Sequence, residues 1–367
     1  MNRGAPIRVL IVDDSAFARQ LFKSILSADD RFEVASLARD GQEALALVDQ
    51  VDPDVITLDL DMPGIDGFSF LRIIMRRRPK PVVVVSSYAG RSDVLRALDL
   101  GAIDFVAKPT RSASTKLADI GDELKEKLFE ASSARIDLYV KQAVQDVTGL
   151  HELPTLKAPI EPPEPTGQAR TLTQPKGIVV VGASTGGPRA LRRMLRDCDL
   201  DHWTMAIAQH MPARFTSEFA ARLARKTGRL VEEGQQGRRL AAGYVTLAPG
   251  GFHMEVQMEG GWPITRLARP TPIERYVPSV DKLFASAAAA FGNRLVAVVL
   301  TGMGDDGLRG VRAVKQAGGI VIAEHASTAV VYGMPMQVVQ AGLADEVLPL
   351  GSIPATLHRL TEQTRQP

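Results

Sequence analysis

The sequence contains one cysteine, Cys198, among 367 residues. A single cysteine can form neither an intrachain disulfide nor a cysteine-based zinc cluster, and it is typical of a protein that works in a reducing cytoplasm. Long apolar runs are also absent: Leu295 to Leu300 is far shorter than the roughly 18 to 20 residues of a membrane span, so no membrane insertion is expected. Residues 1–6 are polar and predict no export signal.

A surplus of charge of one sign is missing as well. The 44 Lys and Arg residues nearly balance the 42 Asp and Glu residues, and a net charge of +2 disfavours a nucleic-acid partner. Charged residues make up 23% and hydrophobic residues 45% of the chain, as in ordinary globular proteins. The length predicts two to three domains at roughly 100 to 200 residues each.

Short apolar runs alternate with amphipathic stretches from Ile7 to about Lys127 and again from Gly177 to about Leu360. This rhythm predicts two α/β domains with doubly wound parallel sheets, the first with five β/α units. Gly-rich spacing between Val245 and Leu267 predicts a small β-hairpin inserted in the second sheet. The expected strands are Ile7–Val12, Phe32–Ala38, Val55–Leu60, Val82–Val85 and Phe105–Ala107, then Ile178–Val181, Met205–Ala208, Tyr244–Ala248, Leu295–Leu300 and Ile320–Ala323.

The expected domain boundaries are 1–127, a linker over 128–175, and 176–367. Prolines are frequent near the end of the linker and favour an extended spacer. They are Pro154, Pro159, Pro162, Pro163, Pro165 and Pro175. The stretch from Ala118 to Val147 can also continue the last helix of the first domain.

Polar residues follow the strands of the first domain at one sheet edge: Asp13 and Asp14, Asp59, Ser86, and Lys108. Three carboxylates in one cleft repel each other unless a cation neutralises them, and their oxygen ligands suit Mg²⁺. Asp59 is then the candidate nucleophile toward a phosphoryl donor, with charge neutralised by Mg²⁺ and Lys108. Taken singly, an Asp pair is more often a helix cap and Lys-Pro a loop. Their joint placement favours chemistry.

The first domain resembles a two-component receiver domain over its whole length. The resemblance rests on Val9-Leu10-Ile11-Val12-Asp13-Asp14-Ser15, Asp54-Val55-Ile56-Thr57-Leu58-Asp59-Leu60-Asp61-Met62-Pro63, Val85-Ser86-Ser87 and Phe105-Val106-Ala107-Lys108-Pro109. It implies that Asp59 is the phospho-acceptor, that Ser86 and Lys108 bind phosphoryl oxygens, and that Phe105 occupies the place of the switch aromatic, where many receivers have tyrosine. The implied Mg²⁺ ligands are Asp13, Asp14, Asp59 and the backbone carbonyl of Asp61.

Residues 182–186 of the second domain fit the pattern G-x-S-x-G, with Ser184 at its centre. Such a turn after a strand has three interpretations. It can be a nucleophile elbow that exposes a serine, a loop that binds phosphate at a helix N-terminus, or a purely structural turn. The pattern alone does not choose among them.

Two further strands of this domain end in residues that a serine nucleophile needs. His210 follows the strand that ends near Ala208, and Asp305 and Asp306 follow the strand that ends near Leu300. A serine needs a base, and the histidine needs a carboxylate that holds its tautomer. Sequence spacing cannot choose between the two aspartates. Another histidine, His253, follows a turn that can border the same cleft.

The second domain resembles the chemotaxis protein-glutamate methylesterase (CheB) family. Its marks are Gly182-Ala183-Ser184-Thr185-Gly186-Gly187, Gln209-His210-Met211-Pro212, Ala248-Pro249-Gly250, Pro278-Ser279-Val280-Asp281 and Thr301-Gly302-Met303-Gly304-Asp305-Asp306-Gly307. The resemblance implies a triad of Ser184, His210 and Asp306 and an oxyanion donor at Met303. Thr185 can steer His210 or cap the following helix.

The resemblance further implies hydrolysis of glutamyl γ-methyl esters on cytoplasmic chemoreceptor helices, with methanol released, and deamidation of receptor glutamines. It implies no cofactor for hydrolysis, activation by a chemotaxis histidine kinase, and a monomer. Two alternatives stay open on the residues themselves: a phosphorylation-controlled module that only binds a helical partner, and a serine hydrolase that acts on another ester or amide.

Overall fold

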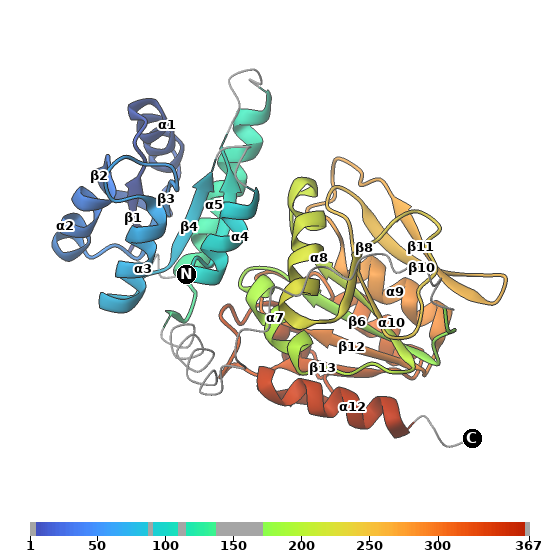
Figure 1. Cartoon of the computed structure of the whole chain (residues 1–367). Helices are drawn as coiled ribbons and strands as arrows, with labels where there is room; N and C mark the ends of the chain where they lie inside the picture. Colours follow the sequence, from blue (N-terminus) through green and yellow to red (C-terminus); the bar gives the residue numbers. More distant parts are fainter. Residues whose placement is uncertain (1–4, 87–90, 109–114, 137–171, 364–367) are drawn as a thin grey trace. The chain divides into compact units, whose positions relative to one another are not determined.

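The computed structural model in Figure 1 describes residues 5–86, 91–108, 115–136 and 172–363. It divides into two compact units, residues 1–145 and 146–367, which are called here the N-terminal and the C-terminal unit. Residues 137–171, most of the predicted linker, lie outside the described residues. The predicted boundary after Lys127 falls inside helix α5, Thr115–Ser132. Within the described ranges, no helix is long and apolar enough to cross a membrane.

The N-terminal unit contains a five-stranded parallel sheet with the order β2-β1-β3-β4-β5. The strands are β1 Ile7–Val12, β2 Phe32–Ala38, β3 Val55–Leu58, β4 Val82–Ser86 and β5 Asp104–Ala107. The helices that precede α5 are α1 Ala16–Ser27, α2 Gly41–Val51, α3 Gly67–Arg77 and α4 Arg91–Leu100. Five β/α units are therefore present, as the apolar rhythm predicts.

The central strands are mostly apolar because helices cover both faces of a parallel sheet. Val9 to Val12 and Val82 to Val85 are almost fully buried. The helices begin where a side chain can cap them: the Ser15 hydroxyl accepts from the Ala18 N–H at 3.3 Å, and Asp66 accepts from the Ser69 N–H at 2.7 Å. Polar residues therefore gather at the carboxyl edge of the sheet where α1 and α3 begin.

The C-terminal unit contains a seven-stranded sheet with the order β14-β13-β12-β6-β7-β9-β8, and every pair in it is parallel. Its strands are β6 Gly177–Ala183, β7 Trp203–Gln209, β8 Leu230–Glu233, β9 Tyr244–Leu247, β12 Leu295–Val299, β13 Ile320–Glu324 and β14 Glu346–Leu348. The short strands β8 and β14 at the two edges were not predicted from the sequence. Both are partly exposed, so neither carries a continuous apolar run.

The predicted β-hairpin is present as β10 His253–Glu259 and β11 Trp262–Ala268. Its expected position inside the main sheet is wrong, because the two strands pair only with each other as a separate antiparallel sheet. The hairpin packs on helix α9 through Met254 and Val256, so it covers that helix instead of extending the sheet.

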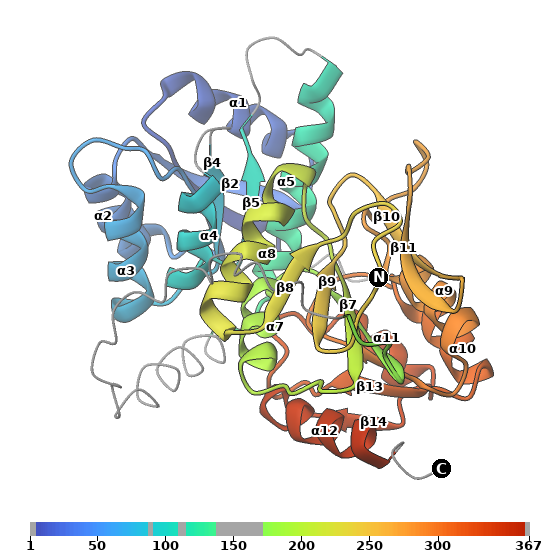
Figure 2. The ribbon, with the colours of Figure 1, turned by 45° about the vertical axis from the view of Figure 1, so that its right-hand side comes forward.

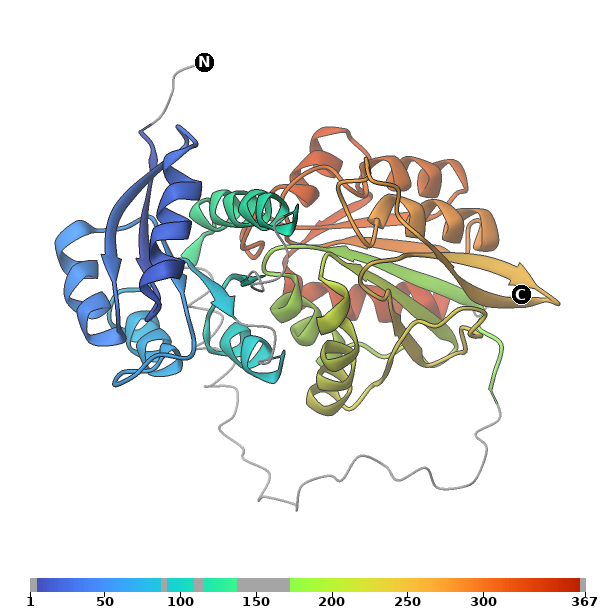
Figure 3. The ribbon, with the colours of Figure 1, turned by 90° about the horizontal axis from the view of Figure 1, so that it is seen from above.

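Helices cover both faces of the seven-stranded sheet. They are α7 Gly187–Arg196, α8 Ala213–Thr227, α9 Val280–Phe291, α10 Leu308–Gln316, α11 Met334–Gln340 and α12 Ile353–Gln363, with a short 3₁₀ turn at Leu350–Ser352. Figure 2 shows α9 and α10 side by side, and in Figure 3 these two helices lie across the sheet from α7 and α8. A core of buried residues from α9, such as Phe284 and Ala287, packs against Val180 and Ala297 of the sheet. The architecture is a doubly wound α/β fold.

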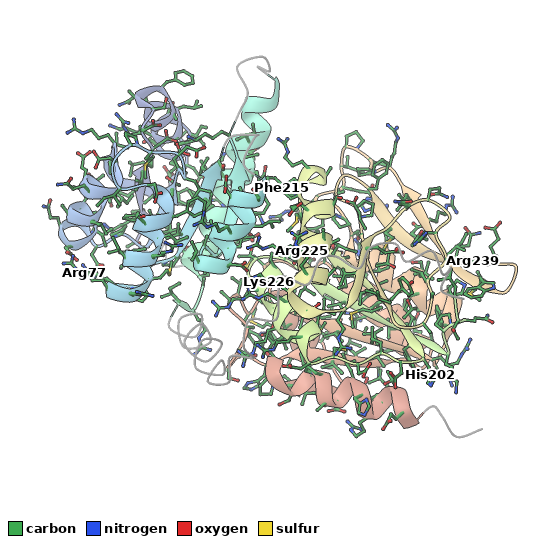
Figure 4. The ribbon with its side chains drawn as sticks, in the orientation of Figure 1. Arg77, His202, Phe215, Arg225, Lys226 and Arg239 are labelled. Atoms are coloured by element: carbon green, nitrogen blue, oxygen red, sulfur yellow. The ribbon has the colours of Figure 1, made fainter. Side chains whose placement is uncertain are left out.

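Helix α8 ends where its sequence predicts an end. Arg225 and Lys226, both labelled in Figure 4, lie in its last turn, where cations interact favourably with the helix dipole. Gly228 follows with φ of 70°, a left-handed conformation that glycine adopts without strain. At its other end, α8 begins shortly after β7, at the carboxyl edge of the sheet.

Candidate functional site

Ser184 lies directly after β6, in the turn that leads to α7. Its N–H donates to the Thr301 carbonyl at 3.0 Å, and its own carbonyl accepts from the Gly187 N–H at 2.7 Å. Thr301 belongs to the turn after β12, so two neighbouring strand ends are joined here. Gly302 approaches so closely that a Cβ on it would lie 2.7 Å from the Cβ of Ser184. The serine is therefore fixed at the carboxyl edge of the sheet.

His210 lies beside Ser184 because β7 pairs with β6. The His210 N–H donates to the Ala183 carbonyl at 3.1 Å. The Gln209 side-chain amide donates to the carbonyls of both Ser184 and His210, at 3.0 and 3.1 Å. Gln209 thus clamps the two turns together, a role that its place in the Gln-His-Met-Pro segment did not reveal. Within the described residues Ser184 Oγ makes no hydrogen bond to His210, and such bonds often form fully only with substrate.

Asp306, not Asp305, contacts the histidine. Its Oδ2 lies 2.8 Å from His210 Nε2, and Asp306 is 4% exposed whereas Asp305 is exposed. The Asp306 carboxylate also accepts from the N–H groups of Val280 at 2.7 Å and Asp281 at 2.9 Å. Burial by itself raises the pKa of Asp306, but the hydrogen bond and charge of His210, together with these amides, lower it below its ordinary value.

The start of α9 supports this carboxylate. Ser279 caps the helix and donates its hydroxyl to Asp306 Oδ1 at 3.1 Å. Asp281, in the first turn of α9, accepts in return from the N–H groups of Gly307 at 2.9 Å and Gly310 at 2.7 Å, at the start of α10. Two carboxylates therefore hold two helix N-termini against each other.

His253 lies behind the same segment and is fully buried. Its Nδ1 accepts from the Ser279 N–H at 3.0 Å, which requires an unprotonated Nδ1, and its Nε2 lies 3.3 Å from Glu274 Oε2 without the geometry of a hydrogen bond. His253 is thus linked to Asp306 through Ser279. Its contact is with the helix cap and not with Ser184 or His210.

Thr185 and Met303, the two residues predicted to assist Ser184, differ in burial and in their backbone contacts. Thr185 is fully buried, and its carbonyl accepts from the Thr301 hydroxyl at 2.9 Å. Met303 is half-buried. Its backbone N–H has no acceptor among the residues that the structure describes, so it is available as a hydrogen-bond donor.

Glu324 was not predicted as a site residue. It ends β13 and is fully buried, and its Oε2 accepts from the Thr301 N–H at 2.8 Å. Burial raises the pKa of Glu324 to about 7, although the Thr301 N–H, the nearby Thr328 hydroxyl and the charge of Arg193 favour its ionised form. The only signal in the sequence was a glutamate at the end of an apolar run.

The aromatic ring of Tyr276 also escaped sequence reasoning. It stacks on His210 with the ring centroids 5.1 Å apart and an interplanar angle of 13°. Tyr276, Ser279 and Asp306 line a cavity of about 590 Å³ beside the His210–Asp306 pair. Tyr276 lies in a loop with no regular pattern, which explains why periodicity gave no indication of it.

The predicted acidic pocket of the N-terminal unit is present at the carboxyl edge of its sheet. Ligand oxygens of Asp13, Asp14 and Asp59 lie within 4.8 Å of one another. Lys108 Nζ lies 2.6 Å from Asp59 Oδ2 and 2.8 Å from Asp13 Oδ2. Burial and the charge of Asp13 raise the pKa of Asp59 to about 6, against the opposing effect of Lys108. One ammonium thus leaves negative charge uncompensated, and this donor set fits a hard divalent cation such as Mg²⁺.

The other predicted residues of this pocket surround Asp59. The Asp61 N–H donates to Asp59 Oδ1 at 3.4 Å. Ser86 is buried at the end of β4, and its carbonyl accepts from the Lys108 N–H at 2.8 Å. Phe105 lies on β5 and is 3% exposed, so its ring belongs to the core. Ser87 and Pro109 lie outside the described residues.

Known proteins resemble both units. A model of the CheB methylesterase family matches residues 179–357, and a model of the response regulator receiver domain matches residues 9–118. The protein-glutamate methylesterase/protein-glutamine glutaminase 6 of Anaeromyxobacter dehalogenans is 43% identical, with 100% of this chain and 99% of that protein covered. The protein-glutamate methylesterase/protein-glutamine glutaminase 1 of Myxococcus xanthus is 40% identical, with 100% of both covered.

Two solved structures match one unit each. The Thermotoga maritima CheB methylesterase catalytic domain is 38% identical with a TM-score of 0.47, and covers 51% of this chain and 98% of its own. The response regulator domain of Thermotoga maritima CheB is 40% identical with a TM-score of 0.33, and covers 35% of this chain and 96% of its own.

Proposed function

This chain belongs to the CheB methylesterase family and is a receiver-controlled protein-glutamate methylesterase/protein-glutamine glutaminase of chemotaxis, and we propose that it works as a serine hydrolase through Ser184, His210 and Asp306. The observation that carries the mechanism is the 2.8 Å contact of His210 Nε2 with a buried Asp306 carboxylate, one strand away from Ser184. Serine is a weak nucleophile unless such a base takes its proton.

The contact with Asp306 occupies Nε2, so Nδ1 of His210 is the nitrogen that accepts the Ser184 proton. Ser184 Oγ attacks the γ-carbonyl carbon of a methylated glutamate, and the carbonyl oxygen becomes an oxyanion. The free N–H of Met303 supports its role as a donor to that oxyanion. The protonated His210 then returns the proton to the leaving methoxide, and methanol departs.

Water completes the cycle. His210 removes a proton from water, the hydroxide attacks the acyl-enzyme, and the proton returns to Ser184 Oγ as the receptor glutamate is released. The same steps on a glutamine side chain release ammonia, since only the leaving group changes. The buried position of Thr185, tied to Thr301, supports a role in holding the turn beside His210 and not in direct contact with substrate.

Phosphorylation of Asp59 controls the catalytic unit in this proposal. Asp13, Asp14, Asp59 and the Asp61 carbonyl would hold Mg²⁺, which neutralises charge during phosphoryl transfer when it is bound. Lys108, already 2.6 Å from Asp59, and the Ser86 hydroxyl would bind the phosphoryl oxygens. Phe105 would act as the switch aromatic by repacking, because it has no hydroxyl.

The proposed partners follow from the family. The substrate is the cytoplasmic helical region of a chemoreceptor, and the phospho-donor is a chemotaxis histidine kinase. The protein acts in the cytoplasm as a monomer, without nucleic acid or membrane insertion and without a cofactor for hydrolysis. The proposed boundaries remain 1–127 for the receiver, 128–175 for the linker and 176–367 for the catalytic domain.

Methanol release from methylated chemoreceptor tests the proposal. Wild-type protein and Ser184→Ala are compared, each with and without a small phospho-donor and Mg²⁺. Release that depends on Ser184 and rises with phospho-donor supports the serine mechanism and its control. Equal release by Ser184→Ala contradicts the mechanism, and no release by either protein favours a pure binding module or another substrate.

A further inference from the structure

We propose that Tyr276 is a positioning residue that stacks on the His210 imidazole and favours its cationic form during catalysis. The inference rests on the proposed function, because it assigns His210 the role of the base. The ring centroids are 5.1 Å apart and the rings are 13° from parallel, which is within the range of stacked aromatic pairs. The face of a phenol ring is negative and attracts a cation placed over it.

The surroundings of Tyr276 fix its ring in place. Its hydroxyl lies so close to Gly304 that a Cβ on residue 304 would clash with it. Gly304 has φ of 93°, so glycine is required there for two reasons. The guanidinium of the preceding residue, Arg275, lies over the Tyr276 ring, 5.4 Å from its centroid. The ring, carried by the loop before α9, is therefore held against the turn after β12.

The loop that carries Tyr276 is itself tied to α9. The Thr271 N–H donates to Glu274 Oε2 at 2.6 Å, and the Glu274 N–H donates to the Thr271 carbonyl at 3.1 Å. Glu274 also forms an ion pair with Lys282 in α9. These contacts anchor the loop just before the ring, so the stacking geometry does not depend on substrate.

Several charged groups face this pair. Asp306 contacts His210 Nε2 at 2.8 Å and favours the imidazolium, while Asp305 and Arg275 lie near Tyr276 with opposite charges. Burial raises the pKa of Tyr276, and this effect, together with the charges of Asp305 and Asp306, outweighs the lowering effects of the Arg275 charge and of the Asp305 backbone hydrogen bond. The phenol therefore stays neutral at physiological pH, with its negative face toward His210.

The stacking acts mainly on the transition state. His210 becomes a cation only after it takes the proton of Ser184. A ring that attracts this cation therefore stabilises the transition state without strengthening substrate binding. Such an interaction raises kcat and leaves KM nearly unchanged. The expected contribution of a cation–π contact corresponds to a factor of about 2 to 30 in rate.

The first experiment compares Tyr276→Leu with Tyr276→Phe in methanol release from methylated chemoreceptor. We expect Tyr276→Leu to lower kcat about 2- to 30-fold with KM changed less than about twofold, and Tyr276→Phe, which keeps the ring, to stay within about twofold of wild type. Tyr244→Leu, a half-buried tyrosine of β9 outside the site, is the matched control for general destabilisation. Thermal unfolding of all variants checks the fold.

The pH profile provides a readout that a purely structural role would not move. Loss of the ring makes the imidazolium less stable, so the midpoint of the acidic limb of kcat/KM should shift to lower pH in Tyr276→Leu and not in Tyr276→Phe. Unchanged kcat and midpoint in Tyr276→Leu would overturn the inference. A change confined to KM, or an equal loss in Tyr276→Phe, would also overturn it, since the ring face would then not be the active feature.

A measurement without turnover separates this inference from the proposed function. NMR titration of the His210 ring in Ser184→Ala and in the double variant Ser184→Ala/Tyr276→Leu reports the stacking directly. A lower midpoint in the double variant supports the role of Tyr276 even if no receptor ester is hydrolysed, and identical midpoints refute it. Failure of methanol release in wild-type protein, by contrast, concerns only the proposed function.

Discussion

Replacement of Asp306 by asparagine tests the site most severely, because the carboxylate accepts hydrogen bonds at both oxygens. Oδ2 accepts from His210 Nε2 and the Val280 N–H, and Oδ1 accepts from the Asp281 N–H and the Ser279 hydroxyl. An asparagine amide must place its NH₂ group at one of these positions. In either orientation a donor faces the backbone N–H of Val280 or of Asp281.

The expected losses differ for activity and stability. An NH₂ group toward His210 would force Nε2 to accept, place the proton on Nδ1 and leave no base for Ser184, which lowers kcat by about 10⁴-fold in comparable triads. One unsatisfied buried N–H costs about 1–3 kcal/mol. Loss of the negative charge at the N-terminus of α9 costs a further 0.3–1 kcal/mol or so. We therefore expect destabilisation of about 1.5–4 kcal/mol.

Two assays separate these effects. Steady-state methanol release gives kcat, and urea unfolding gives the free energy of unfolding under conditions where the variant is folded. Asp305→Asn is the matched control, because the neighbouring carboxylate is exposed and makes no contact with His210. It should retain kcat within about threefold. If Asp306→Asn kept kcat within tenfold of wild type, the assignment of Asp306 as the orienting carboxylate would be wrong.

Three further predictions follow from buried groups and close contacts. Burial raises the pKa of Glu324 from 4.5 to about 7, so the folded state holds its proton more tightly and stability falls as pH rises through this window. Glu324→Gln should remove about 3 kcal/mol of that fall in urea unfolding between pH 4.5 and 8, and parallel pH profiles of variant and wild type would contradict this. Asp59→Asn should abolish stimulation by phospho-donor and leave basal methanol release intact. Removal of Mg²⁺ by chelation should likewise abolish the stimulation of wild-type protein. Stimulation that persists in Asp59→Asn would rule out control through this carboxylate. Gly302→Ala places a Cβ 2.7 Å from that of Ser184 and should lower kcat on the order of 10²-fold with the fold intact. A variant whose kcat equals that of wild type would show that the turn shifts to accommodate the methyl group.

The sequence predicted the parallel sheets and their carboxyl edges well, because the information is local there. A strand buried on both faces is an unbroken apolar run, as in Val82 to Val85, and the polar residue after it lies at the sheet edge. The positions of Asp59 and Ser184 at the ends of their strands were predicted in this way. The edge strands β8 and β14 were not found, since partial exposure gives them no such run.

Residues that act across the fold had no local signature. Glu324 contacts Thr301 from a neighbouring strand, and Tyr276 reaches His210 from a loop that is distant in sequence. Spacing also could not separate Asp305 from Asp306, because neighbouring side chains in a turn point in different directions. In the structure Asp306 contacts His210 and accepts from the N-terminal amides of α9, which supports the choice of Asp306.

The two sites show how the donors around a buried aspartate determine its chemistry. Asp59 and Asp306 are both buried, yet the pKa of Asp59 is raised to about 6 and that of Asp306 is lowered. Asp306 lies on the N-terminus of α9, and Asp281 lies reciprocally on that of α10, so backbone amides compensate both charges within the protein. Asp306 is therefore ionised and poised to orient an imidazole. Asp59 accepts one weak backbone bond at 3.4 Å among the described residues and shares Lys108 with Asp13, so its charge remains under-compensated and an added cation is favoured before it can act as the proposed nucleophile. A helix terminus thus makes the proposed triad aspartate independent of external cations, whereas the proposed phospho-acceptor, which has no comparable donors among the described residues, responds to them.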